Sequence, residues 1–231
     1  VMAISIGMLL SALAMTWHLV HFHYVKFNKE SMYEVSKKII LLCIPLLLSA
    51  QFIAGILNEA LDLTDTNQEL FISMSHNIFG VLSIAIVVPI LEEVLFRGAI
   101  EGHLLRKGWS PKWAILVSAL IFGIIHGNPA QIPFAFLIGL LFGWLYYRTG
   151  SLVPGIVGHI INNSFGAWTM FTATREELSQ TTMETLGTTI TYILLVLAII
   201  VFIGMYLYLN KYLPKPTNIQ VKAINEQDIT I

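Results

Sequence analysis

Three short stretches place polar and ionisable side chains inside segments that are otherwise apolar. They are EEVLFR at 92–97, FGIIH at 122–126 and HIINN at 159–163. The groups in them that can do chemistry are two carboxylates, one guanidinium, two imidazoles and one amide, on Glu92, Glu93, Arg97, His126, His159 and Asn163. Such groups are costly next to hydrocarbon and usually face a cavity or a partner. The set therefore indicates a functional site.

Hydrolysis of a peptide bond is a reaction that this set suits. The reaction needs a base that activates water, a partner for the oxyanion and a proton donor for the leaving amine. We expect Glu92 to act as the base and His126 to hold the same water. His159 and Asn163 are four residues apart and share a helix face, and we expect both to donate hydrogen bonds to the oxyanion.

A bound metal is the alternative that the same residues leave open. Glu92, His126 and His159 would then be three ligands of a zinc ion, with water as the fourth ligand. The sequence lacks the HExxH helix of common zinc proteases, and it offers no serine elbow or Cys/His pair in place of the glutamate. We favour a site without a tightly bound cofactor and keep zinc as the alternative.

The two adjacent glutamates are expected to have different tasks. Successive residues on a helix point about 100° apart, so Glu92 and Glu93 do not both face one water. Glu93 is four residues from Arg97, which is the spacing of an ion pair along a helix. We predict that Glu93 and Arg97 hold the helix in place and that Glu92 does the chemistry.

The composition is that of a membrane protein. Of the 231 residues, 56% are hydrophobic and 12% are charged, and the mean hydropathy is +0.74, whereas a soluble domain has about 25% charged residues. The net charge of −1 argues against nucleic acid as a partner, because no basic surface is available to neutralise phosphates. The single cysteine, Cys43, excludes an internal disulfide, and we expect it to be a buried apolar residue.

The apolar stretches predict an all-α, polytopic transmembrane bundle with about seven spans. The spans cover approximately residues 1–25, 38–57, 74–105, 112–128, 131–147, 151–171 and 186–209. We group them into one transmembrane domain over residues 1–213, followed by a polar cytoplasmic tail over 214–231. Four glycines in the later spans predict close contacts between helices; they are Gly139, Gly143, Gly155 and Gly158.

The basic residues predict how the bundle lies in the bilayer. Of the 13 lysines and arginines, 12 lie in or near every second connection between the predicted spans or after the last span, and only Arg175 lies in one of the other connections. The 12 are Lys26, Lys29, Lys37, Lys38, Arg97, Arg106, Lys107, Lys112, Arg148, Lys211, Lys215 and Lys222. Basic residues concentrate on the cytoplasmic side, so we predict an N-terminus outside and a C-terminus in the cytoplasm. The protein is then a multi-pass integral membrane protein, of the plasma membrane if the source is bacterial.

The same topology predicts that the polar side chains meet at one depth. Glu92 lies fourteen residues before Arg106, and His126 lies fourteen residues after Lys112. Both are therefore about 20 Å from the turn that joins their helices. The span over 151–171 enters from the same side and brings the third stretch to a similar level.

Together the three stretches resemble the EExxxR, FxxxH and HxxxN motifs of the CPBP family, and they occur in the family's order. These intramembrane proteases include the CAAX prenyl endopeptidases and the Abi proteins of bacteriocin processing or immunity. The resemblance covers about residues 70–170. It implies that the six residues form the site of an intramembrane endopeptidase, whose partners are the lipid bilayer and a peptide or membrane-anchored substrate.

Two other functions fit the same residues. One is a non-catalytic membrane scaffold or bacteriocin immunity protein that keeps the fold without the reaction. The other is a proton-coupled transporter, because buried glutamates and histidines also form proton relays. Cleavage that depends on Glu92 distinguishes the protease from both.

Overall fold

The computed structural model describes residues 1–25 and 35–213, and the regular secondary structure within these ranges is entirely helical. This confirms the predicted all-α class. The predicted tail over 214–231 lies outside the described residues, as do Lys26 and Lys29.

Each of the seven predicted spans coincides with a long helix or a continuous series of helical segments. The segments are α1 (Met2–His21), α2 (Lys37–Leu61), α3 (Gln68–Ser75), α4 (Ile78–Leu82), η1 (Ser83–Val87), α5 (Val88–Glu93), η2 (Val94–Glu101), α6 (Gly102–Arg106), α7 (Pro111–Ile125), α8 (Ile132–Thr149), α9 (Val153–Thr172), α10 (Arg175–Ser179), α11 (Thr182–Leu186) and α12 (Thr188–Tyr212). The short helices α3, α10 and α11 were not among the predicted elements.

Five helices in the described part of the chain are long and apolar enough to cross a membrane. They are Met2–His21, Lys37–Leu61, Ile78–Arg106, Ile132–Thr149 and Thr188–Tyr212. The apolar helix α7 is shorter, with 15 residues, and α9 is not among the five. A multi-pass membrane protein is therefore confirmed, while the count of seven spans stays a prediction.

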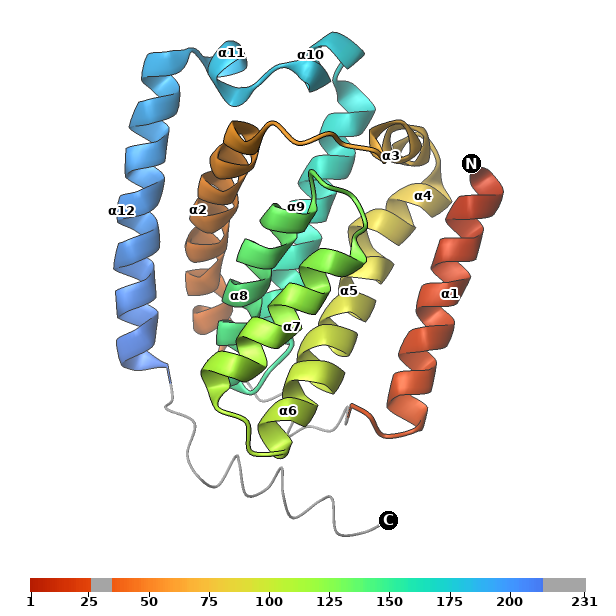
Figure 1. Cartoon of the computed structure of the whole chain (residues 1–231), viewed down its shortest axis with the longest axis vertical. Helices are drawn as coiled ribbons and strands as arrows, with labels where there is room; N and C mark the ends of the chain where they lie inside the picture. Colours follow the sequence, from red (N-terminus) through yellow and green to blue (C-terminus); the bar gives the residue numbers. More distant parts are fainter. Residues whose placement is uncertain (26–34, 214–231) are drawn as a thin grey trace.

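The helices pack around α9, which contacts α2 and α8 on one side and η1 and α5 on the other. Helix α12 packs against α2 at one edge of the bundle, and α1 packs against the segments from α4 to η2 at the opposite edge (Figure 1). Helix α7 lies along α8 and also contacts η2. The three motif-bearing helices are thus neighbours inside the bundle.

One continuous helix over 78–106 carries the first motif, and two stretches of it are π-helical. Asn77 begins the helix, because its side chain accepts a hydrogen bond from the backbone N–H of Gly80. Pro89 lacks an N–H and cannot make the normal α-helical bond. The backbone adjusts just before it, where the N–H of Val88 bonds the carbonyl of Ser83 five residues earlier. Such π stretches are a common way for a membrane helix to accommodate proline.

Each π stretch is also bonded to a neighbouring helix through its backbone. The carbonyl of Ile84 in η1 accepts a hydrogen bond from the Asn163 side chain of α9, at 3.0 Å. The carbonyl of Phe96 in η2 accepts one from the Ser118 hydroxyl of α7, at 2.8 Å. The first motif is therefore fixed to the helices that carry the other two motifs.

The four glycines lie at close contacts between helices, as predicted. A methyl group added at Gly143 would lie 2.6 Å from a carboxylate oxygen of Glu101, and one added at Gly139 would lie 3.1 Å from the ring of Phe122. Added methyl groups at Gly155 and Gly158 would also meet side chains of neighbouring helices. Small residues let membrane helices approach closely.

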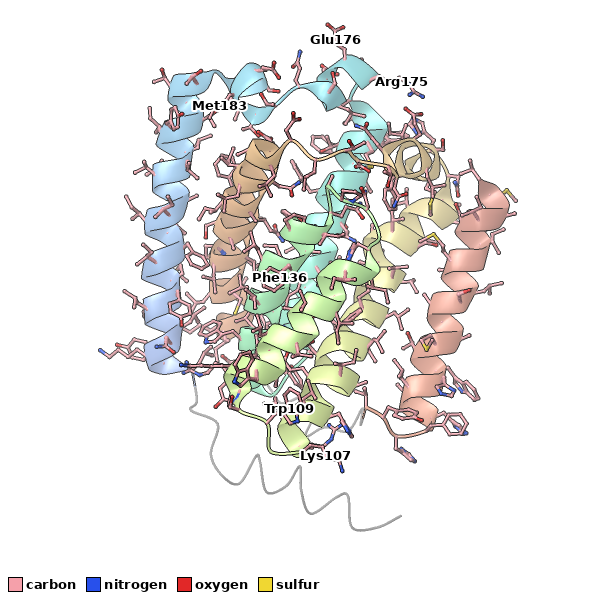
Figure 2. The ribbon with its side chains drawn as sticks, viewed as in Figure 1. Lys107, Trp109, Phe136, Arg175, Glu176 and Met183 are labelled. Atoms are coloured by element: carbon pink, nitrogen blue, oxygen red, sulfur yellow. The ribbon has the colours of Figure 1, made fainter. Side chains whose placement is uncertain are left out.

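The two ends of the bundle carry different residues. Lys107 and Trp109 lie at one end, and Arg175 and Glu176 lie at the other (Figure 2). Cys43 is buried in the main apolar cluster between α2, α8 and α12, which confirms the interpretation of this residue as part of the core.

Candidate active site

Glu93 and Arg97 form a buried ion pair on the helix over 78–106. Each is only 1% exposed, and Glu93 Oε1 lies 3.2 Å from Arg97 Nη1. Arg97 Nη2 also donates a hydrogen bond to the carbonyl of Gly139 at 3.2 Å, and the guanidinium lies over the ring of Phe122 at 4.4 Å from its centroid. The predicted pairing of Glu93 with Arg97 is confirmed.

The glycine at position 155 gives the Glu93 carboxylate its place against α9. A methyl group there would lie 2.7 Å from Glu93 Oε2, closer than real Cβ contacts permit. Any larger residue at this position would displace the carboxylate or push the two helices apart.

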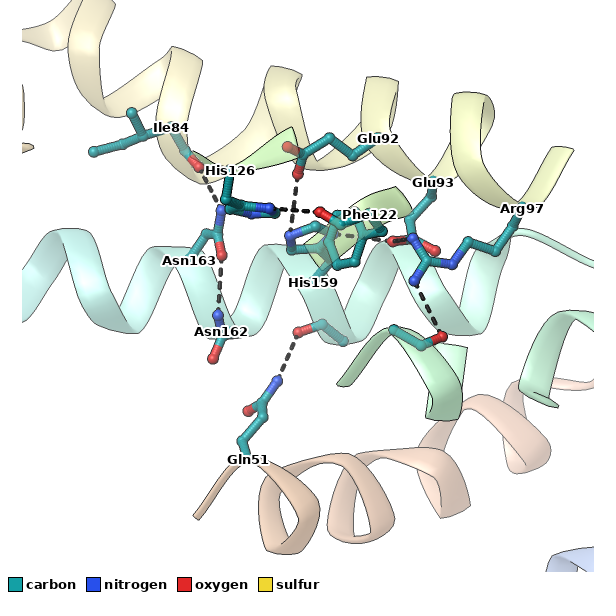
Figure 3. Close-up of polar contacts among 12 residues, drawn as sticks. Gln51, Ile84, Glu92, Glu93, Arg97, Phe122, His126, His159, Asn162 and Asn163 are labelled. Atoms are coloured by element: carbon teal, nitrogen blue, oxygen red, sulfur yellow. Dashed lines mark hydrogen bonds and ion pairs between the residues drawn. The ribbon is translucent and has the colours of Figure 1, made fainter. Parts of the chain in front are cut away.

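His159 lies between the two glutamates (Figure 3). Its Nδ1 is 3.0 Å from Glu93 Oε1, and its Nε2 is 3.4 Å from Glu92 Oε2. The adjacent glutamates thus approach one imidazole from opposite edges of the ring. Glu93 is shared between Arg97 and His159, so the charged side chains form one connected network.

Glu92 and His126 line the same cleft. Its volume is about 220 Å³, and the other lining residues are Val88, Leu91, Leu95, Phe96 and Ile125. The Glu92 side chain is 19% exposed, in contrast to the buried Glu93. The cleft has room for water, and its wall is apolar apart from the carboxylate and the imidazole.

The imidazole of His126 is oriented by the helix that carries it. Its Nδ1 lies 2.7 Å from the carbonyl oxygen of Phe122. A carbonyl only accepts, so Nδ1 carries the proton and donates it, and a neutral ring then has Nε2 as an acceptor. The ring also packs edge-on against Phe122, at 4.9 Å between centroids. His126 is therefore held as a single tautomer with a free lone pair.

Asn163 connects α9 to the first motif helix. Its Nδ2 donates to the carbonyl of Ile84, and its Oδ1 accepts a 3.0 Å hydrogen bond from Asn162 Nδ2. We expected His159 and Asn163 to be oxyanion donors. In the structure both ring nitrogens of His159 face carboxylates, and one amide N–H of Asn163 is bonded to the backbone; the oxyanion role of the two residues stays a prediction.

The residues do not fit a metal centre. No three His, Cys, Asp or Glu side chains between residues 1–25 and 35–213 come together in a group that could hold a metal ion. The alternative zinc set of Glu92, His126 and His159 is therefore unsupported. A zinc-bound imidazole directs a nitrogen lone pair at the metal, whereas both nitrogens of His159 face glutamate oxygens.

Two residues of the network were not singled out from the sequence. Phe122 is buried and contacts both imidazoles and the guanidinium of Arg97. Glu101 is fully buried, and neither of its carboxylate oxygens has a hydrogen-bond partner among the described residues. The signal for both was spacing, because Phe122 is four residues before His126 and Glu101 is four residues after Arg97.

Comparison with known proteins matches residues 74–165 to the family described as "Type II CAAX prenyl endopeptidase Rce1-like". The chain is 38% identical to YdiL of Bacillus subtilis over 81 residues, which is 35% of this chain and 33% of YdiL. It is 33% identical to the membrane-embedded CAAX protease MroQ of Staphylococcus aureus over 106 residues, covering 44% of this chain and 42% of MroQ. It is 28% identical to YxdF of Lactococcus lactis over 122 residues, covering 52% of this chain and 63% of YxdF. The chain thus spans between a third and two thirds of the length of these relatives. No solved structure matches it.

Proposed function

We propose that this chain, whose residues 74–165 match the Rce1-like family of type II CAAX prenyl endopeptidases, hydrolyses peptide bonds in the membrane with Glu92 as the general base. The observation that carries this proposal is the division between the two glutamates. Glu92 faces the cleft beside His126, whereas Glu93 is buried between Arg97 and His159. Only the first carboxylate is placed to meet water and substrate.

The reaction begins with a water molecule in the cleft. Glu92 accepts a proton from this water, and Nε2 of His126 accepts its second hydrogen bond, so the oxygen lone pair points at the substrate carbonyl. Attack forms the C–O bond and a tetrahedral intermediate. Glu92 then returns its proton to the leaving amine as the C–N bond breaks. A positioned base of this kind contributes about 10²–10⁴-fold to the rate.

The buried residues hold Glu92 in place for this step. Glu93 fixes the ring of His159 through Nδ1, and His159 Nε2 in turn restrains the carboxylate of Glu92. Asn163 fixes α9 to η1 and thereby the height of His159 beside the motif. These residues act as positioning groups.

The substrate class follows from the lining of the cleft. Its wall consists of aliphatic and aromatic side chains apart from Glu92 and His126, which suits an apolar peptide segment or one delivered by a membrane anchor. We place the bundle with the Lys107 end in the cytoplasm, since basic residues concentrate there. We also propose that residues 1–213 form one transmembrane domain.

A comparison of cellular peptides tests the function directly. Cells that produce the wild-type protein and cells that produce Glu92→Gln are compared by labelling new peptide N-termini and identifying them by mass spectrometry. We expect N-termini that appear only with the wild type, and the purified wild type in lipid nanodiscs should produce the same cleavage in a synthetic peptide. Identical N-termini in both samples, at equal protein levels, would leave the scaffold function as the better account.

A further inference from the structure

The turn after His126 is bonded to a distant loop of the chain. Asn128 is fully buried, and its Nδ2 donates a 2.7 Å hydrogen bond to Asp65 Oδ1 in the loop between α2 and α3. Its Oδ1 accepts a 3.1 Å hydrogen bond from the backbone N–H of Thr66 in the same loop. Both ends of one amide side chain are therefore used to join two loops 63 residues apart in the sequence.

The loop side of this contact is itself ordered by a hydrogen bond. Asp65 Oδ1 also accepts a 2.8 Å bond from the backbone N–H of Asn67. The carboxylate is thus held by its own loop before it meets Asn128. We call the bonded group of Asp65, Thr66 and Asn128 the loop clamp.

The backbone of Asn128 helps to begin α8. Its carbonyl accepts hydrogen bonds from the N–H groups of Gln131 and Ile132, at 2.9 and 3.1 Å. On the other side, Gly127 has a positive φ of 61°, a conformation that glycine adopts at little cost. Only this one residue separates the clamped Asn128 from His126.

The last two residues of α7 contribute little packing to the bundle. Ile124 is 58% exposed and Ile125 is 63% exposed, so both side chains point away from the bundle. Phe122 and Gly123 anchor the inner face of the last turn of α7, and Gly123 lies against Ile132 and Phe136 of α8. The chain beyond this turn is held by the hydrogen bonds of Asn128. The position of His126 relative to the cleft therefore depends on how firmly that connection is fixed.

We propose that the loop clamp is the positioning device for His126, and that Asn128 and Asp65 are positioning residues for the reaction. This inference rests on the proposed function for its effect on rate, but the clamp itself is a structural property. Loss of the clamp lets the end of α7 move and carries Nε2 of His126 away from the water. A misplacement of about 1 Å can reduce a rate by about 10²-fold.

A swap of the two side chains tests the clamp. Asn128→Asp alone places two carboxylates against each other, whereas Asp65→Asn alone keeps a side-chain oxygen that can accept from the Asn128 amide and removes only the charge. In the double variant the amide comes from position 65 and the carboxylate from position 128, which still accepts from the N–H of Thr66. We expect kcat to fall about 10–100-fold in Asn128→Asp with little change in KM, and the double variant to recover most of the loss. Asp62→Asn, which removes a carboxylate from the same loop outside the clamp, is the matched control and should keep the wild-type kcat.

Hydrogen–deuterium exchange separates the clamp from the chemistry. In Asn128→Asp the amides of residues 126–131 should exchange faster than in the wild type, and the double variant should restore their protection. Faster exchange with an unchanged kcat would overturn the positioning role and leave the proposed function intact. If the wild type cleaves no peptide, the proposed function fails, and the exchange of the single and double variants still decides whether the clamp exists. Unchanged exchange in Asn128→Asp would overturn the clamp itself.

Discussion

Replacement of Glu93 by glutamine is expected to destabilise the fold without changing the shape of the site. Glutamine keeps an oxygen that can accept the hydrogen bond from His159 Nδ1, but it removes the negative charge 3.2 Å from Arg97 Nη1. The guanidinium is 1% exposed and then keeps the carbonyl of Gly139 and the rings of Phe122 and Phe142 as neighbours, without the carboxylate that paired with it. Breaking a buried ion pair in this way costs about 3–5 kcal/mol.

The assay is a double-mutant cycle on the free energy of unfolding. Wild type, Glu93→Gln, Arg97→Gln and the double variant are unfolded in the same mixed micelles, and their free energies of unfolding are compared. Each single variant should lose about 3–5 kcal/mol, and the double variant should be more stable than the sum of the losses predicts, because neither position 93 nor position 97 then carries a charge that has lost its partner. Glu92→Gln is the control: its side chain faces the cleft, so it should unfold like the wild type while cleavage falls by about 10²–10⁴-fold.

Two results would refute the reasoning. Additive losses would mean that the two charges do not stabilise each other. A Glu93→Gln protein with wild-type stability and no cleavage, beside a Glu92→Gln protein that still cleaves, would show that the roles of the two glutamates are reversed.

Three further predictions concern the packing, pH dependence and orientation of the bundle. Gly155→Ala should destabilise the protein by about 1–3 kcal/mol through overpacking, whereas Gly166→Ala on the same helix, where a methyl group meets nothing within 4 Å, should not; equal unfolding free energies for both would contradict the close contact. Hydrogen bonds from the backbone N–H and hydroxyl of the N-cap threonine of α10 lower the pKa of Glu177. The contribution of Glu177 to the stability of α10 should therefore be complete above the unfolded-state pKa of about 4.3, and it should be lost as the pH falls through the lower folded-state pKa. Lower protection of the α10 amides at pH 3 than at pH 6, after correction for the intrinsic exchange rate at each pH, and absent in Glu177→Gln, checks this prediction. A reporter fused after Lys211 should indicate the cytoplasm and one inserted near Asp65 the outside, and the reverse pattern would invert the proposed orientation.

Local spacing along one helix was predictable from the sequence. The ion pair of Glu93 with Arg97 follows from their four-residue separation, and it is present. The close approach at Gly143 and Gly155 follows from the small size of glycine in membrane helices, and each receives a buried carboxylate. Such features depend only on residues near one another in the chain or on the size of one residue.

Relations between helices were less predictable. Whether His159 faces one glutamate or lies between two depends on the rotation of α9 about its axis, which sequence spacing does not specify. The bond from Asn163 to the Ile84 carbonyl depends on the π stretch before Pro89, and regular α-helical spacing over residues 74–105 does not include this change. The sequence therefore predicted the members of the site better than their contacts.

The short helices α10 and α11, unlike the contacts between helices, can be predicted from the sequence, because each begins with a capping box. Both begin with a threonine followed three residues later by a glutamate, Thr174 with Glu177 and Thr181 with Glu184. This pattern marks a helix start in the sequence itself. The two short helices were predictable from local chemistry, although they lie outside every apolar span.

The π-helical stretches make the length of the motif helix as important as its composition. A π turn bonds each N–H to the carbonyl five residues back instead of four, so η1 accommodates one more residue than an α-helical turn would. Deleting one residue from Ser83–Val87 would let this stretch return to α-helical bonding and would leave the two halves of the helix facing nearly the same directions as before. The wide turn thus lets the Ile84 carbonyl bond Asn163 while Glu93 and Arg97 face the bundle interior, although the helix holds one more residue. A single-residue deletion outside a π stretch has no extra residue to remove, and it would rotate the helix after it by about 100° against the helix before it.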